Sequence, residues 1–195
     1  MSKAKKTKRY IVEQTAHLFN KKGYVGTSLT DLTNATKLTK GSIYGNFAHK
    51  EEVAIAAYNY NYQDLIKRFA PKLNAEKTAK GKLYAFLSTY EDAYGDLMAI
   101  GGCPILNNAV DADDTNSTLS ELSVKAFKDW NNTLRHIVTE GKVTKEIYDA
   151  IDVQYYADLF IINIEGSLML SKSTGEKRYF EHAIRHLKSI IKDTF

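Results

Sequence analysis

The stretch that most constrains this chain runs over residues 27–50 and predicts two short helices joined by a tight turn. Leu29 and Leu32 lie one helical turn apart in the first helix, and Ile43 and Phe47 lie one turn apart in the second. Hydroxyl residues precede both helices, where a side-chain oxygen can cap an exposed backbone N–H group. Each helix therefore has a clear start and a narrow core-facing side.

The remaining surface of the second helix has no carboxylate and consists of Lys40, Gly41, Ser42, Tyr44, Gly45 and Asn46. Small residues let a helix approach a groove closely, serine and asparagine can bond base edges, and lysine and tyrosine can hold phosphates. Two short helices that meet at a sharp turn, the second polar and free of acids, predict a helix-turn-helix.

The pattern resembles the DNA-binding signature of tetracycline-repressor (TetR) family regulators. The matching positions are Thr27-Ser28-Leu29-x-x-Leu32, Ala35, Leu38 to Tyr44, Phe47 and Lys50-Glu51-Glu52, with Ile11, Ala16, Leu18-Phe19 and Gly23-Tyr24 upstream. The resemblance implies an all-α fold of about nine helices, with a three-helix helix-turn-helix domain over residues 1–54. A helical ligand-binding and dimerisation domain is expected over residues 55–195. Lys37 departs from the family, which often has glycine at this turn, so we expect a positive φ there.

The same resemblance assigns contacts to the operator, a double-stranded DNA site. We expect Ser42, Tyr44 and Asn46 to contact bases or the adjacent backbone, and Thr27, Thr39, Lys40 and Lys50 to hold phosphates. Ser28, Gly41 and Gly45 complete the predicted surface. Charge supports this placement, because residues 1–50 hold ten lysines and arginines against two acids, whereas the rest of the chain is mildly acidic.

The first eight residues after Met1 contain five cations and predict a frayed arm before a helix over about residues 7–22 that ends at Gly23. The arm either adds phosphate contacts or is a solvated tail.

Composition excludes several classes of protein. Two prolines and long stretches without glycine favour helices, and the single cysteine rules out an intramolecular disulfide and a cysteine-rich zinc site. No apolar run is long enough to span a membrane and no secretory signal follows the basic start, so we expect a cytoplasmic protein. His182 and His186 lie four residues apart without a metal-binding motif, and no catalytic constellation is present. We therefore expect no enzyme, metal or cofactor.

Further helices are expected at about 52–69, 76–95, 97–109, 116–140, 144–172 and 176–193. Thirteen tyrosines is a high number, and inward-facing rings with a few polar groups suit a small-molecule pocket. The resemblance implies such a pocket for a small, apolar or partly aromatic effector. The candidates, each of which could instead be ordinary core, are Phe86, Tyr90, Tyr94, Met98, Cys103, Trp130, Leu134, Phe160 and Glu165.

Cys103 follows two glycines and precedes Pro104, which suits the first turn of a helix. A thiol at a helix N-terminus could be a redox or electrophile sensor. A buried cysteine that serves as a small apolar side chain is the alternative.

The last two helices predict an interface with a second copy of the chain, because the first of them is apolar on more than one side. TetR-type regulators similarly dimerise through their last two helices. The expected interface residues are Tyr155, Leu159, Ile162, Gly166, Met169, Phe180, Ile184, Leu187 and Ile191.

The interpretation is a ligand-responsive homodimeric repressor that binds a near-palindromic operator and is released by an effector. Alternatives are a thiol-based sensor through Cys103, a DNA binder without sequence preference, and a helical enzyme that carries a helix-turn-helix. The sequence does not determine the operator, the effector, or whether binding represses or activates transcription.

Overall fold

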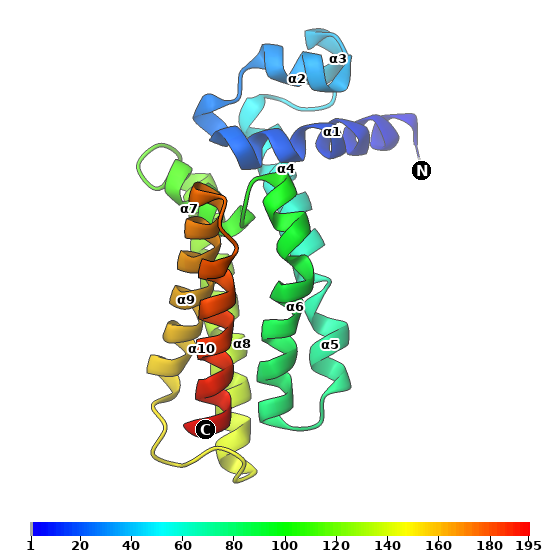
Figure 1. The fold of residues 1–195 in the computed structure, drawn as a ribbon. Helices are drawn as coiled ribbons and strands as arrows, with labels where there is room; N and C mark the ends of the chain where they lie inside the picture. Colours follow the sequence, from blue (N-terminus) through cyan, green and yellow to red (C-terminus); the bar gives the residue numbers. More distant parts are fainter. Residues whose placement is uncertain (1) are drawn as a thin grey trace. The chain divides into compact units, whose positions relative to one another are not determined.

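The computed structural model describes residues 2–195, which form ten α-helices and no strand (Figure 1). The expected all-α fold is confirmed. The helices are α1 (Lys3–Gly26), α2 (Leu29–Thr36), α3 (Lys40–Tyr44), α4 (Lys50–Ile66), α5 (Phe69–Ala75), α6 (Ala79–Ile100), α7 (Pro104–Ala112), α8 (Ser117–Val143), α9 (Val153–Thr174) and α10 (Arg178–Asp193).

The extra helix relative to the sequence expectation is α5, which contains Pro71 in its first turn. Proline is tolerated there because the N–H group that it lacks has no partner inside the helix. The expected helix over 97–109 was wrong in its bounds, since α6 continues through Gly95 to Ile100 and α7 begins at Pro104. No helix among residues 2–195 is both long enough and apolar enough to cross a membrane.

The chain divides into two compact units. The N-terminal unit comprises the residues up to Asp64 together with Ile100–Ser123, and the C-terminal unit comprises Leu65–Ala99 and Val124–Phe195. The N-terminal unit thus includes α7 and the start of α8 in addition to the predicted helix-turn-helix. The functional boundary proposed after residue 54 stays a prediction.

The core of the N-terminal unit fixes the position of α3. Ile43 and Phe47 are buried among apolar side chains of the first, second and fourth helices, and Ala112 of α7 and Leu119 of α8 belong to the same cluster. Ile43 lies in α3 and Phe47 follows three residues after its end, so the burial of both side chains leaves the opposite side of α3 to solvent.

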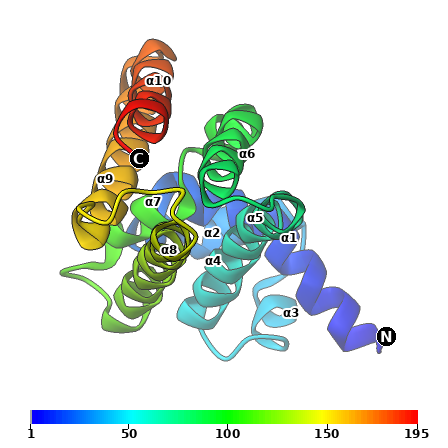
Figure 2. The same ribbon diagram turned by 90° about the horizontal axis from the view of Figure 1, so that it is seen from below.

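In the C-terminal unit, α9 and α10 pack side by side (Figure 2). The apolar residues of α10 form a single stripe, in which Phe180, Ile184, Leu187 and Ile191 are all buried. An amphipathic helix of this kind buries one face and leaves the other to water.

Candidate nucleic-acid interface

The start of α2 is held by a capping box. The Asp31 backbone N–H donates to Ser28 Oγ at 3.1 Å, and the Ser28 N–H donates to Asp31 Oδ2 at 2.8 Å. Lys22 Nζ lies 2.6 Å from Asp31 Oδ1. The Lys22 ammonium, followed by the Ser28 N–H, lowers the pKa of Asp31 far below its usual range. These contacts fix where the helix-turn-helix begins.

The turn between α2 and α3 has the geometry expected from Lys37. This residue adopts a left-handed conformation (φ 56°, ψ 21°), and its N–H donates to the Thr33 carbonyl at 2.9 Å. Thr39 then caps α3, because its Oγ1 accepts from the Ser42 N–H at 3.2 Å. The tolerated positive φ predicted at Lys37 is confirmed.

The exposed side of α3 brings together most of the predicted DNA contacts. Lys40, Gly41 and Gly45 are exposed, while Ser42, Tyr44 and Asn46 are half-buried. The Asn46 side-chain amide donates to the Ser42 carbonyl at 2.9 Å, which leaves its carbonyl oxygen pointing elsewhere as an acceptor. A surface with small residues, hydroxyls, an amide and a lysine suits the base edges and backbone phosphates of a DNA groove.

Thr27 does not join this surface. It is fully buried, and its hydroxyl donates to the Gly23 carbonyl at 2.7 Å. The predicted phosphate contact by Thr27 is therefore wrong for this conformation: the side chain closes the turn between α1 and α2, whereas Ser28 beside it is exposed.

Lys50 has a structural role that the sequence did not indicate. Its Nζ donates to the carbonyls of Tyr24 at 2.7 Å and Thr27 at 3.0 Å, and it lies 4.3 Å from the centre of the Tyr24 ring. Two of its three N–H groups are thus used within the chain. A phosphate contact through the third stays a prediction.

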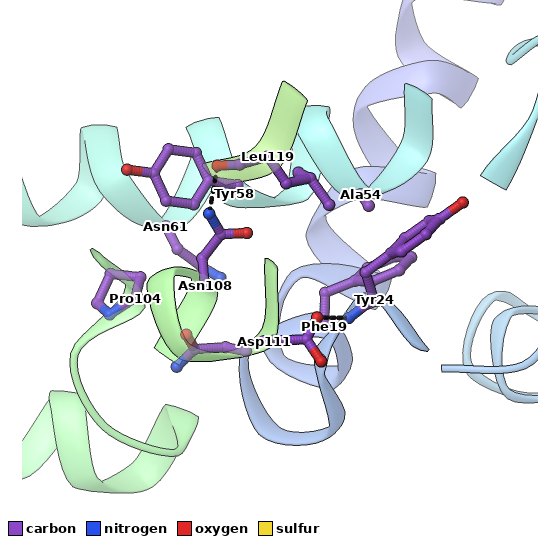
Figure 3. A pocket seen from close by; sticks show the side chains of 11 residues that line it. Phe19, Tyr24, Ala54, Tyr58, Asn61, Pro104, Asn108, Asp111 and Leu119 are labelled. Atoms are coloured by element: carbon purple, nitrogen blue, oxygen red, sulfur yellow. Dashed lines mark hydrogen bonds between the residues drawn. The ribbon is translucent and has the colours of Figure 1, made fainter. Parts of the chain in front are cut away.

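Asp111 of α7 also holds the connection between α1 and α2, a role that the sequence did not indicate. Its Oδ2 accepts from the Tyr24 N–H at 2.5 Å. Gly23, at φ 72° and ψ 177°, lets the backbone approach, because a Cβ there would lie 2.0 Å from Asp111 Oδ1. Figure 3 shows Asp111 and Tyr24 among the residues that line a cavity of about 20 Å³, which has room for about one water molecule. The cavity is lined from α1, α4, α7 and α8.

Asparagine side chains fasten the Gly101–Gly102 loop and α7 to the end of α1. Asn20 Nδ2 donates to the carbonyls of Ile100 at 2.9 Å and Gly102 at 3.0 Å, and Asn107 Nδ2 donates to the Asn20 carbonyl at 3.0 Å. Cys103 follows this loop as the buried N-cap residue of α7. It therefore belongs to the N-terminal unit, and its grouping with pocket residues of the C-terminal unit is not supported.

Three of the predicted pocket residues, Phe86, Tyr90 and Trp130, form one aromatic cluster in the C-terminal unit with Phe69, which sequence reasoning missed. Their ring centroids lie 5.0–5.9 Å apart. Leu134 is buried one helical turn after Trp130 on α8.

The other candidates lie apart from this cluster or make different ring contacts. Tyr94 stacks on Phe180 with centroids 4.8 Å apart, and Phe160 stacks on Phe195 at 6.4 Å. Met98 is half-buried and Glu165 is buried. Tyr94 and Phe160 thus contribute to packing around α10 and the C-terminus.

The predicted dimer residues divide between α9 and α10. Phe180, Ile184, Leu187 and Ile191 of α10 are at most 3% exposed within a single chain, so their assignment to an interface is wrong. Periodicity predicted their burial, and the same chain provides it, since α10 packs against α9 and Phe180 also stacks on Tyr94 of α6. On α9, Tyr155, Ile162 and Met169 are 57%, 66% and 48% exposed, and Leu159 and Gly166 are half-buried on the same side.

Comparison with known proteins gives two family matches. Residues 11–57 match the family described as "Bacterial regulatory proteins, tetR family", and residues 79–187 match "Tetracyclin repressor-like, C-terminal domain". The chain belongs to the TetR family. Residues 11–57 contain the complete helix-turn-helix, and this TetR-family chain is a DNA-binding transcriptional regulator.

Solved TetR-family structures resemble the whole chain. A regulator from Cytophaga hutchinsonii is 41% identical, with a TM-score of 0.91 over 100% of this chain and 97% of that one. One from Chloroflexus aurantiacus is 36% identical, with a TM-score of 0.94 over 100% and 98%. The HTH-type transcriptional repressor DhaR from Mycobacterium sp. is 23% identical over 85% of this chain and 82% of its own length. All three are regulators of transcription.

Proposed function

We propose that this TetR-family regulator is a homodimeric repressor that binds a near-palindromic operator in the cytoplasm and leaves it when a small-molecule effector binds. The observation that supports DNA reading best is the acid-free side of α3, held outward by the burial of Ile43 and Phe47. Repression is supported by the family and by a relative that is itself a repressor.

In this proposal α3 enters the major groove. Ser42, Tyr44 and Asn46 contact bases or the adjacent backbone, and Thr39, Lys40 and the remaining N–H group of Lys50 hold phosphates. Gly41 and Gly45 allow close approach, and Ser28 offers a hydroxyl at the start of α2. Thr27 is left out because it is buried.

We assign dimerisation to the exposed apolar side of α9, which includes Tyr155, Ile162 and Met169. An exposed apolar stripe of this length is a common mark of a protein–protein interface. A two-fold axis would place two copies of α3 about 34–36 Å apart, one turn of the duplex.

The effector we propose is apolar or partly aromatic and binds in the C-terminal unit near Phe86, Tyr90, Trp130 and Leu134. The clustered rings support this chemistry, because they offer stacking and apolar contact to a ligand that separates them. Sensing through Cys103 is less well supported, since this residue is 1% exposed and out of reach of a reagent in solution.

The test is fluorescence anisotropy of the purified protein with its own upstream DNA and with scrambled DNA of equal length. We expect at least a ~10³-fold preference for one site and two protomers per site. Tyr44→Ala should abolish most of that preference, whereas Tyr148→Ala, which removes an exposed tyrosine from the loop before α9, should leave it unchanged. Equal and steeply salt-dependent binding to both DNAs would favour a non-specific DNA binder.

A further inference from the structure

We infer that the first two turns of α1 form a second DNA contact, in which Lys3 and Lys6 bind backbone phosphates beside the groove that α3 enters. This inference rests on the proposed operator binding and adds a surface to it. The sequence left open whether these lysines contact phosphates or belong to a solvated tail.

The segment is a helix and not a frayed arm. Ser2 caps α1, since its Oγ accepts from the Lys5 N–H at 3.3 Å. One residue into the second turn, the Thr7 hydroxyl donates to the Lys3 carbonyl at 3.2 Å. Because the segment is helical, the 3.6-residue period determines the side of α1 on which each lysine lies.

Tyr10 identifies the side of α1 that faces the helix-turn-helix. Its hydroxyl donates to the Thr36 carbonyl at 3.0 Å, at the end of α2 and directly before Lys37. Lys6 and Lys3 precede Tyr10 by four and seven residues, and these spacings place side chains on one helix face. Lys3 and Lys6 therefore lie on the same side of α1 as the turn that leads into α3.

The other cations of this segment point elsewhere or are already paired. Lys8 Nζ lies 2.7 Å from Glu52 Oε1, and Arg9 Nε lies 2.7 Å from Glu13 Oε1. Lys5 is exposed, but it precedes Tyr10 by five residues. At about 100° of rotation per residue, its side chain lies about 140° around the helix from that of Tyr10. Among residues 2–195, no ion pair involves Lys3 or Lys6, and both are exposed.

Lys3 and Lys6 lie beyond the point at which α1 contacts the helix-turn-helix. With a rise of about 1.5 Å per residue, Lys6 and Lys3 lie about 6 and 10 Å beyond Tyr10 along the axis of α1. Figures 1 and 2 both show the first turns of α1 extending past α3. In this proposal, the lysines that extend past α3 meet the phosphates that border the groove, which is about 12 Å wide. Lysine binds phosphate as a point charge without reading sequence.

The experiment measures the salt dependence of DNA binding by the full chain. Lys3→Gln and Lys6→Gln are made singly and together, and Lys5→Gln is the matched control, since it removes the same charge from the same helix. Anisotropy is recorded with operator and with random DNA at several salt concentrations, and circular dichroism checks that each variant keeps its helices. Each lost phosphate contact should reduce the slope of log K against log salt by about 0.9.

For a dimer, the double variant should lose about 3.6 from that slope, four contacts at about 0.9 each, and both DNAs should be weakened alike. Lys5→Gln should change the slope much less. The inference is overturned if the double variant keeps the wild-type slope, or if Lys5→Gln reduces it as much as Lys6→Gln does. A wild-type protein that does not prefer its operator would contradict the proposed function instead, and the slopes would still decide the role of the lysines.

Discussion

The carboxylate of Asp111 accepts a hydrogen bond from the backbone N–H of Tyr24 at 2.5 Å, across 87 positions of sequence. Through this contact α7 holds the connection between α1 and α2, and Lys50 holds the same connection from α4 through the Tyr24 carbonyl. The orientation of the helix-turn-helix thus depends on a residue far outside the sequence segment that defines it.

Removing this contact should destabilise the N-terminal unit. Asp111→Ala leaves the Tyr24 N–H without its charged acceptor, and we expect a loss of about 1.5–3 kcal/mol in the free energy of unfolding. Gly23→Ala should cost at least as much, because its φ of 72° is unfavourable and its methyl group would meet the Asp111 carboxylate. Urea denaturation measures both. Asp113→Ala, an exposed neighbour, is the control, and an equal loss there would show that Asp111 has no special role.

Lys37→Gly should stabilise the protein. Glycine adopts the left-handed conformation of this position without the cost of about 1–2 kcal/mol that other residues incur, although it gains entropy in the unfolded chain. We expect a net gain of about 0.5–1 kcal/mol by thermal or urea unfolding. Lys37→Ala removes the same charge but keeps the conformational strain, so an equal gain in that variant would contradict the explanation.

Stability should fall in acid partly through Asp31. Its pKa is lower in the folded protein than in the unfolded chain, owing first to Lys22 and then to the Ser28 N–H. The stabilisation is therefore complete above the unfolded pKa, about pH 4, and is lost as the pH falls toward the lower folded-state value. Asp31→Asn should lower stability at neutral pH and flatten the decline below about pH 4. The measurement is the urea midpoint as a function of pH. Parallel curves for the wild type and Asp31→Asn would contradict this explanation.

Phe69→Ala should open a cavity against Trp130, the only tryptophan of the chain. Loss of a buried phenylalanine costs about 3–5 kcal/mol, and the emission of Trp130 should shift to longer wavelength as water approaches it. Tryptophan fluorescence during urea unfolding reports both effects. Phe127→Ala, at a half-buried site on the same helix as Trp130, should cost less and shift the emission less.

Ile162→Glu should convert dimers to monomers, because it places a charge in the middle of the exposed apolar side of α9. Sedimentation equilibrium gives the dimer dissociation constant, which we expect to rise at least ~100-fold, the effect of about 2.8 kcal/mol. Val143→Glu changes a residue that is also exposed, at the end of α8, and should leave association unchanged. A dimer that survives Ile162→Glu would place the interface elsewhere.

The exposed side of α3 was predictable from sequence because it depends on local spacing. The burial of Ile43 and Phe47 determines which side of α3 faces the core, and helical periodicity then leaves Lys40, Gly41 and Gly45 exposed and Tyr44 and Asn46 partly exposed. Thr27 was misassigned because the pattern of residues does not show whether a hydroxyl points outward or closes a turn.

The burial of α10 was also predictable, but its partner was not. Ile184 and Leu187 have the spacing of a buried stripe, and that spacing is the same whether α9 or a second protein covers it. The roles of Asp111 and Lys50 depend on hydrogen bonds between distant segments, which leave no periodic signal in the sequence.

The placement of Ile100–Ser123 has a consequence for engineering. A chain truncated after residue 54, or even after Asp64, would lack Ala112 and Leu119 from its core and Asp111 from the Tyr24 connection. Chimaeric regulators that exchange specificity by grafting the N-terminal segment alone would inherit an incomplete scaffold. A graft that carries both stretches of chain would transfer the helix-turn-helix together with the residues of α7 and α8 that pack against it.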